Sequence, residues 1–210
     1  MRLKHVKNAD IIINQGTYYI NDPTIYKGSW SKLFNNTNPI YIEIGIGKGT
    51  FIIENALKYP NINFIGIEKF DSVIVRAIEK SNSLELNNLK LIRMDAEQLS
   101  DIFSKEISLL YLNFSDPWPK AKHAKRRLTS PKFLSIYDNI FKDTKHIIMK
   151  TDNNPLFDYS LETLVDNGYK INYQTRDLHK ENPLDNIMTE YEAKFVTKGI
   201  KINKLDATKE

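Results

Sequence analysis

The sequence predicts an α/β fold built on a mostly parallel, seven-stranded sheet with an antiparallel edge, and three observations lead to this prediction. From residue 40 onward, short apolar runs alternate with stretches of helical periodicity, which is typical of parallel strands connected by helices. Glycine and acidic residues follow several of these runs, where open α/β sheets bind their ligands. The last two runs come late in the chain and suggest a closing antiparallel edge.

The first part of this pattern contains four apolar runs. Residues 50–58 and 71–80 separate the first three of them and repeat apolar side chains with a helical period. We therefore expect helices over these two stretches. The expected strands are Ile40–Ile44, Asn63–Ile67, Leu89–Ile92 and Ile107–Asn113.

The second part of the pattern begins at Pro131, a residue suited to the first turn of a helix. Amphipathic spacing continues this helix to Ile140. A further helix over residues 156–165 ends near Asn167-Gly168, which can form a left-handed cap. The remaining expected strands are Lys145–Met149, Tyr169–Tyr173 and Glu190–Val196.

Length and composition fit one domain with a short extension. The chain has 210 residues, enough for a sizeable core, and its 41% hydrophobic and 27% charged content is ordinary for a globular protein. Residues 1–38 lack clear periodicity and are rich in Asn, Tyr and Gly. We expect residues 1–38 to form an irregular N-terminal arm and residues 39–210 to form the domain.

Several classes of protein are disfavoured. The chain has no cysteine, which excludes a disulfide framework, and its four scattered histidines give little support for zinc, so we expect no metal. The apolar run at residues 11–13 is far too short for a signal peptide or a membrane span. We therefore expect a cytoplasmic protein.

A glycine-rich turn follows the first expected strand. Glu43 precedes three alternating glycines, of which Gly45 is the first, and such glycines let backbone amides approach a ligand. The spacing is not the dinucleotide fingerprint, because Thr50 stands where that fingerprint has a glycine. By itself, the turn fits a tight connection with no ligand equally well.

Two more acidic residues follow the next strands. Glu68 is placed to accept hydrogen bonds from ribose hydroxyls, and Asp95 from an adenine amino group. Either carboxylate alone could simply be a solvated strand end or a helix cap. Together with Glu43 they favour a cationic nucleoside cofactor without phosphates, and S-adenosylmethionine fits because its sulfonium and ammonium prefer acidic surroundings.

The segment after the fourth strand carries the most specific signal. Asp116 and Trp118 lie among prolines, and this arrangement suggests a pocket for a flat polar ring. Residues 120–127 hold five of the 30 lysines and arginines and no acidic residue, a density that can bind a polyanion. A charged loop is often only solvated, but the neighbouring Asp and Trp favour chemistry on a nucleic-acid base.

Six motifs between residues 39 and 195 resemble those of the bacterial tRNA (guanine-N7-)-methyltransferases. The elements around Asp116 and Thr189 are much more specific than the glycine turn, which methyltransferases of this fold share broadly. The motifs are Glu43-Ile-Gly-Ile-Gly-Lys-Gly49, Phe64-Ile-Gly-Ile-Glu68, Leu112-Asn-Phe-Ser-Asp-Pro-Trp-Pro-Lys120, Lys125-Arg-Arg-Leu-Thr129, Lys150-Thr-Asp-Asn153 and Met188-Thr-Glu-Tyr-Glu192.

The resemblance implies a class I S-adenosylmethionine-dependent methyltransferase fold of the Rossmann-like type, and methyl transfer to N7 of guanine 46 in the variable loop of tRNA. It implies that Asp116 is catalytic and contacts the cofactor together with Glu43, Glu68 and Asp95. The substrate-binding residues that it implies are Lys120, Asp152, Thr189, Glu190, Tyr191 and Glu192. The RNA-contacting residues are Lys122, His123, Lys125, Arg126 and Arg127.

Other interpretations stay open at this point. Ala121 stands where the family commonly has a basic residue and Lys122 where it commonly has Arg, so we expect a planar, bidentate phosphate contact to be weaker here. A methyltransferase acting on another RNA base or on an exocyclic amine is the nearest alternative, and a noncatalytic RNA-binding protein with the same fold is the next. A nicotinamide-dependent oxidoreductase is the third. The sequence is compatible with a monomer or a homodimer.

Overall fold

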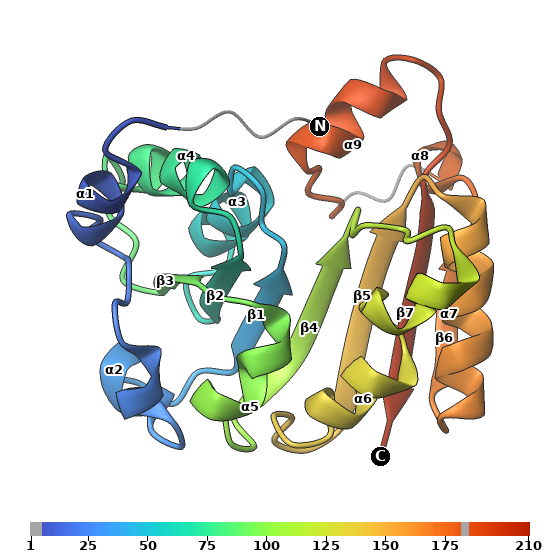
Figure 1. Ribbon diagram of the computed structural model, residues 1–210, viewed down its shortest axis with the longest axis horizontal. Coiled ribbons are helices and arrows are strands. Elements are labelled where there is room, and N and C mark those ends of the chain that lie inside the picture. The colour runs from blue at the N-terminus through green and yellow to red at the C-terminus, as the bar shows by residue number, and fades with distance from the viewer. Residues whose placement is uncertain (1–5, 182–184) are drawn as a thin grey trace.

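The sheet at the centre of the fold has seven strands in the order β3-β2-β1-β4-β5-β7-β6 (Figure 1). This computed structural model describes residues 6–181 and 185–210. The first five strands are parallel to one another, whereas β7 runs antiparallel to both β5 and β6. The strands are β1 (Ile40–Ile44), β2 (Asn63–Glu68), β3 (Leu89–Arg93), β4 (Ile107–Asn113), β5 (Lys145–Thr151), β6 (Lys170–Thr175) and β7 (Asn203–Lys209).

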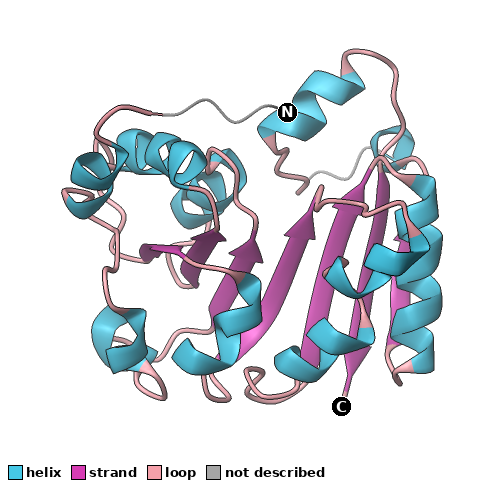
Figure 2. Cartoon of the chain, viewed as in Figure 1, coloured by secondary structure: helices cyan, strands magenta, loops and turns pink. Residues whose placement is uncertain are grey.

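Helices cover the two faces of this sheet (Figure 2). One buried cluster joins the sheet to α2, α5, α6 and α7, and a second joins it to α1, α3 and α4. The described α-helices are α1 (Ala9–Asn14), α2 (Trp30–Phe34), α3 (Thr50–Lys58), α4 (Asp71–Ser81), α5 (Leu99–Ile102), α6 (Pro131–Tyr137), α7 (Asn154–Asp166), α8 (Leu178–Glu181) and α9 (Glu190–Val196). The 3₁₀ turns are η1 (Pro23–Tyr26), η2 (Ala96–Gln98) and η3 (Ala121–Arg126).

The predicted α/β class and its antiparallel edge are confirmed, but one predicted strand is wrong. Residues 190–196 form the helix α9, and the strand that completes the sheet is β7. A capping box between Thr189 and Glu192 starts α9. In β7 only alternate positions are buried, with Leu205 and Ala207 pointing into the core, and this weak apolar signal explains why the strand was missed.

The N-terminal arm is more ordered than its sequence predicts. Between residues 6 and 38 it contains α1, η1 and α2, and α1 packs against α4. Trp30 is fully buried, and its indole Nε1 donates a 2.7 Å hydrogen bond to the carbonyl of Ile102. Within the described residues, no helix is both long and apolar enough to cross a membrane.

Candidate active site

A cavity of about 620 Å³ opens at the carboxyl ends of the parallel strands. Gly45 follows β1, Glu68 ends β2, Asp95 follows β3, and Asp116 follows β4; all four line this cavity. They meet because parallel strands end at one edge of the sheet, where the chain order reverses around β1. The structure therefore brings together four of the predicted site residues.

The Glu68 carboxylate is held in place by backbone amides. Its Oε2 accepts from the N–H of Gly47 at 3.0 Å, and its Oε1 accepts from the N–H groups of Lys69 and Phe70 at 2.9 and 3.1 Å. Burial raises the pKa of Glu68, and these three amides oppose the rise. A carboxylate has about four acceptor sites, so the amides leave one free for a ligand in the cavity.

The glycine turn keeps this wall of the cavity open. Gly45 has a φ of 78°, and a Cβ built there would meet nothing within 4 Å. Gly49 has a φ of 80°, and its added Cβ would lie 2.6 Å from the Cβ of Ala77 in α4. The first glycine therefore leaves space beside the cavity, whereas the third lets α3 and α4 approach closely.

Both oxygens of the Asp95 carboxylate already accept hydrogen bonds from the protein. Its Oδ1 accepts from the N–H of Glu97 at 3.0 Å, and its Oδ2 accepts from Lys69 Nζ at 2.6 Å. Burial tends to raise the pKa of Asp95, but the bonds from Lys69 and Glu97 more than offset burial and hold that pKa below its usual range. The carboxylate is ionised at neutral pH and lies at the cavity wall.

Asp116 is exposed at the cavity, in a loop with unusual backbone geometry. Among the described residues, no hydrogen bond or ion pair engages its carboxylate, so both oxygens face solvent or ligand. Phe114 and Trp118, on either side of it, have φ values of 52° and 42°. Bulky residues rarely adopt this left-handed region, and where they do the surrounding structure imposes it.

Arg127 braces this loop. Its Nε and a terminal guanidinium nitrogen donate to the carbonyls of Pro117 and Trp118 at 3.2 and 3.1 Å. The guanidinium lies 4.2 Å from the ring centroid of Tyr159 in α7. Arg127, predicted to contact RNA, is thus turned toward the loop that carries Asp116.

The rest of the basic run lies at the surface beside the cavity. Lys120, Lys122, Lys125 and Arg126 are exposed, and Arg126 also lines the cavity. Trp118 packs within this run, with Arg126 4.8 Å from its ring centroid and His123 edge-on at 5.8 Å. Trp118 therefore packs the loop, while its side chain still borders the cavity.

The other predicted substrate residues lie outside the cavity lining. Asp152 borders a separate hollow of about 500 Å³. Glu190 forms ion pairs with Lys80 and, at 4.0 Å, with Lys48. Burial, followed by the charge and hydrogen bond of Asp152, raises the pKa of Tyr191.

One aromatic contact connects α9 to the cavity. The ring of Phe114, which lines the cavity, lies 4.9 Å from the ring of Tyr191. Tyr191 in turn stacks on Phe195 at 4.1 Å. The start of α9 therefore lies beside the loop of Asp116, although no pattern in the sequence placed these aromatic residues together.

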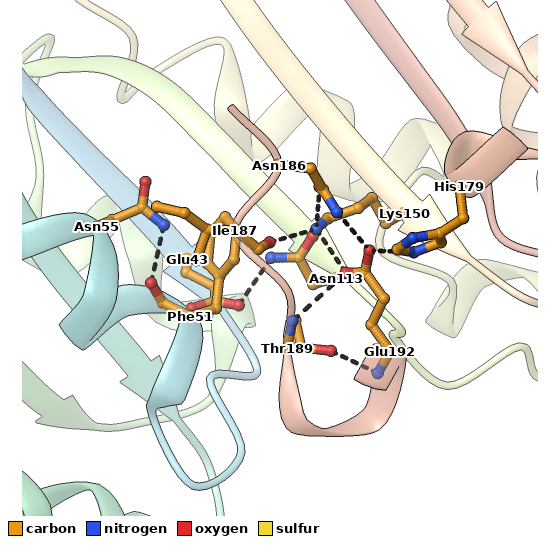
Figure 3. A network of polar contacts seen from close by, with 10 residues as sticks. All are labelled: Glu43, Phe51, Asn55, Asn113, Lys150, His179, Asn186, Ile187, Thr189 and Glu192. Atoms are coloured by element: carbon orange, nitrogen blue, oxygen red, sulfur yellow. Dashed lines mark hydrogen bonds and ion pairs between the residues drawn. The ribbon is translucent and has the colours of Figure 1, made fainter. Parts of the chain in front are cut away.

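Glu192 is completely buried in a network of polar contacts (Figure 3). Its carboxylate lies 2.6 Å from Nζ of Lys150, a residue near the end of β5. Burial lowers the pKa of Lys150, and the charge of Glu192 opposes this. Both residues fall in motifs that resemble the family's, but no spacing in the sequence indicates that Lys150 and Glu192 pair with each other.

Glu43 also points away from the cavity. It is 1% exposed, and only Asn113 Nδ2, at 2.9 Å, donates to it among the described residues (Figure 3). Ile42 and Ile44 pack into the cluster with α6 and α7, so Glu43, between them on β1, faces the opposite side of the sheet. Burial raises the pKa of Glu43 from 4.5 to about 8.

We expect the Glu43→Gln substitution to remove a pH dependence of stability. In the folded protein Glu43 keeps its proton up to about pH 8, whereas in the unfolded chain it loses the proton near 4.5. The wild-type free energy of unfolding should therefore fall as pH rises between these values, by up to about 1.4 kcal/mol per pH unit. Glutamine does not titrate, so urea unfolding across this range should show a shallower slope for the variant.

The matched control is Glu54→Gln in α3, because Glu54 is exposed. This variant should keep the wild-type slope. Equal slopes for the wild type and Glu43→Gln would mean that Glu43 is ionised in the folded protein.

The arrangement contains no recognisable metal site in the part of the chain that is described, since no three His, Asp or Glu side chains are grouped to hold an ion. The site consists of a cavity lined by carboxylates and by the glycine turn, and an exposed basic surface lies beside it. Such a cavity suits a cationic or neutral nucleoside, because carboxylates would repel a phosphate.

Comparison with protein families gives a match over most of the chain. Residues 37–205 match the family described as "Putative methyltransferase". A tRNA (guanine-N(7)-)-methyltransferase of Lachnoclostridium phytofermentans is 48% identical, over 100% of this chain and 99% of that protein. Proteins of the same name from Bacillus cytotoxicus and Listeria monocytogenes are 48% and 46% identical, over 99% of this chain and 96% and 98% of theirs.

Solved structures of low sequence identity share the fold. One described as "Structure of an Antibiotic Related Methyltransferase" has a TM-score of 0.64 at 18% identity, over 92% of this chain and 97% of that chain. The crystal structure of the 16S rRNA methyltransferase KamB has a TM-score of 0.66 at 13% identity, over 87% and 93%. These similarities confirm the predicted class I methyltransferase fold.

Proposed function

The chain belongs to the tRNA (guanine-N(7)-)-methyltransferases, and we propose that its cavity binds S-adenosylmethionine and that its Asp116 loop directs the methyl group to N7 of guanine 46 in tRNA. The observation that carries this proposal is the position of Asp116. It borders a cavity lined by Gly45, Glu68 and Asp95 and lies in the same loop as the basic run at residues 120–127.

The residues of the cavity fit this cofactor. The free acceptor site of Glu68 would take a ribose hydroxyl, and Asp95 would accept from the adenine amino group. Gly45 leaves backbone space for the amino-acid end. Glu43 does not line the cavity and keeps its proton up to about pH 8, so it would neither contact the cofactor nor present a charge to it at neutral pH.

S-adenosylmethionine supplies an electrophilic methyl group on a sulfonium, whose bond to sulfur is replaced by a bond to guanine N7. That nitrogen already presents a lone pair, so the protein need not remove a proton. Its task is alignment, which can account for about 7 to 11 kcal/mol of the barrier. As the guanine ring becomes positive, the Asp116 carboxylate would stabilise it.

The substrate side is proposed to extend from Lys120 to α9. Lys120 would contact a phosphate beside the target nucleotide, and Asp152 with Thr189, Glu190 and Tyr191 would hold the base. Lys122, His123, Lys125 and Arg126 would contact the RNA backbone, and Arg127 would support them. The target guanine is extruded from its stack, because folded tRNA shields N7.

We expect Arg127→Lys to lower turnover about tenfold and to leave the affinity for tRNA within about twofold. Lysine keeps the charge but loses the planar fork that holds Pro117 and Trp118, and a hydrogen bond of this kind contributes about 1 kcal/mol. Steady-state kinetics and filter binding would measure the two effects.

Lys125→Ala is the comparison variant, because Lys125 is exposed. It should weaken tRNA binding and reduce the salt dependence of binding by about one unit of slope. A loss of tRNA affinity in Arg127→Lys would instead make Arg127 a direct RNA contact.

The test of the proposed function is labelled methyl transfer from S-adenosylmethionine to unmodified tRNA transcripts, with the product nucleoside identified. We expect N7-methylguanosine, and we expect it to disappear when guanine 46 is replaced. Label on another base or atom would overturn the proposed specificity. Cofactor binding without any transfer would support a noncatalytic RNA-binding role.

A further inference from the structure

The buried pair formed by Lys150 and Glu192 joins two segments far apart in the sequence. Their side chains are 3% and 0% exposed, and Nζ lies 2.6 Å from Oε2. Lys150 lies near the end of the interior strand β5, and Glu192 lies in the first turn of α9 (Figure 3). A buried charge pair of this kind is costly to break from one side, because the remaining charge has no partner.

Neither side chain has capacity left for a substrate. Besides Lys150, the Glu192 carboxylate accepts from His179 Nε2 and Asn186 Nδ2, both at 2.9 Å, and from the N–H of Thr189 at 3.4 Å. These four donors fill the acceptor sites of a carboxylate. The Lys150 ammonium also donates to the carbonyl of Ile187 at 2.8 Å and to Asn186 Oδ1 at 3.1 Å, which uses its three protons.

The segment that this pair holds cannot be stable by itself. Helix α9 has seven residues, and isolated helices of this length do not persist in water. Its capping box depends on Glu192, because the side chain that receives Lys150 also accepts from Thr189. Besides the contacts of Glu190 and Tyr191, the position of residues 186–196 at the carboxyl end of the sheet therefore depends on Lys150.

The backbone of Lys150 also contacts the start of the loop that carries Asp116. Its carbonyl accepts a 2.8 Å hydrogen bond from the N–H of Phe114, the residue that lines the cavity and contacts Tyr191. The backbone of Lys150 thus holds one side of the site, and its side chain holds the other.

We propose that Lys150 is a positioning residue, and that Glu192 acts as its buried anchor and does not contact the guanine. The pair fixes residues 186–196 beside the Asp116 loop, so that Thr189, Glu190 and Tyr191 face the substrate. The proposal rests on the proposed function only for the identity of that substrate.

The test is a double-mutant cycle of Lys150→Met and Glu192→Gln. Each single variant leaves one buried charge unpaired, so kcat/KM for tRNA should fall at least about tenfold. The double variant removes both charges of the pair, so its kcat/KM should be about tenfold higher than that of the worse single variant. The affinity for S-adenosylmethionine should stay within about twofold in all three. The proposal would be overturned if Lys150→Met alone had normal activity and the double variant were as inactive as Glu192→Gln. Glu192 would then be a substrate contact.

Hydrogen exchange provides a second readout that needs no activity. Amides of residues 186–196 should exchange at least about tenfold faster in Lys150→Met than in the wild type, and the double variant should reverse this. Lys145→Met is the matched control, since Lys145 pairs with Asp138 at the opposite end of β5 and should leave α9 unchanged. Unchanged exchange in Lys150→Met would refute the anchoring role. A wild-type protein that transfers no methyl group would refute the proposed function alone.

Discussion

Replacing Asp116 by asparagine is expected to lower the turnover number for methyl transfer about 10²- to 10³-fold, the range found when one group that stabilises transition-state charge is removed. The carboxylate is exposed at the cavity and forms no hydrogen bond with the described residues. Asparagine keeps the shape of the side chain but not the negative charge that faces the methylated, positive guanine. Single-turnover kinetics with both substrates saturating would measure the effect.

The same variant should bind tRNA and S-adenosylmethionine within about threefold of the wild type, since binding energy expressed only in the transition state does not alter ground-state affinity. Asp101→Asn, an exposed acid in α5, is the control and should leave turnover unchanged. Weak tRNA binding by Asp116→Asn, with normal turnover of the bound RNA, would contradict the catalytic role and make Asp116 a binding residue.

Replacing Glu68 by glutamine is expected to weaken the binding of S-adenosylmethionine about 10- to 100-fold. A hydrogen bond to a charged group contributes about 1.5 to 3 kcal/mol, and Glu68 lines the cavity with one acceptor site that the three amides do not use. Glutamine has a single acceptor oxygen, so it would also release one or more of the amides of Gly47, Lys69 and Phe70. Calorimetric titration with the cofactor would measure this change.

The tRNA affinity of Glu68→Gln should not change, because Glu68 is buried and its carboxylate is bound by backbone amides. Turnover at saturating cofactor should fall much less than the affinity does. Glu79→Gln is the control, since Glu79 is an exposed partner of Arg76 in α4. Normal cofactor affinity in Glu68→Gln would place the ribose elsewhere in the cavity.

Much of the fold could be predicted because strand and helix periodicity is a local property. The first five strands lie within two residues of their predicted bounds, and α3, α4 and α7 cover the stretches predicted as helices.

Helix α6 is shorter than predicted, ending at Tyr137. The error at residues 190–196 came from aromatic and β-branched residues that resemble a strand, whereas the capping box and the buried pair favour a helix. In β7, the positions between the buried residues are only partly buried and polar, which hides the strand in the sequence.

The cavity could be predicted for the same reason. Glu68, Asp95 and Asp116 each follow a strand of a parallel sheet, and parallel strands end at one edge, so their convergence required only the order of the elements. Similarity of the motifs then indicated the reaction. The location of the cavity and the reaction could be predicted because they depend on which residues follow each strand, and not on the direction of any side chain.

By itself, the sequence determined the α/β class, the parallel sheet and the line of acids at its carboxyl edge, because these follow from local periodicity and from strand ends. Only the tertiary structure decided that Glu43 faces away from the cavity, that Arg127 braces the Asp116 loop, and that Glu192 is paired with Lys150. Each of these depends on which face of an element a residue occupies and on a partner distant in sequence. The burial of a charge is set by such partners, and they come together only when the chain folds.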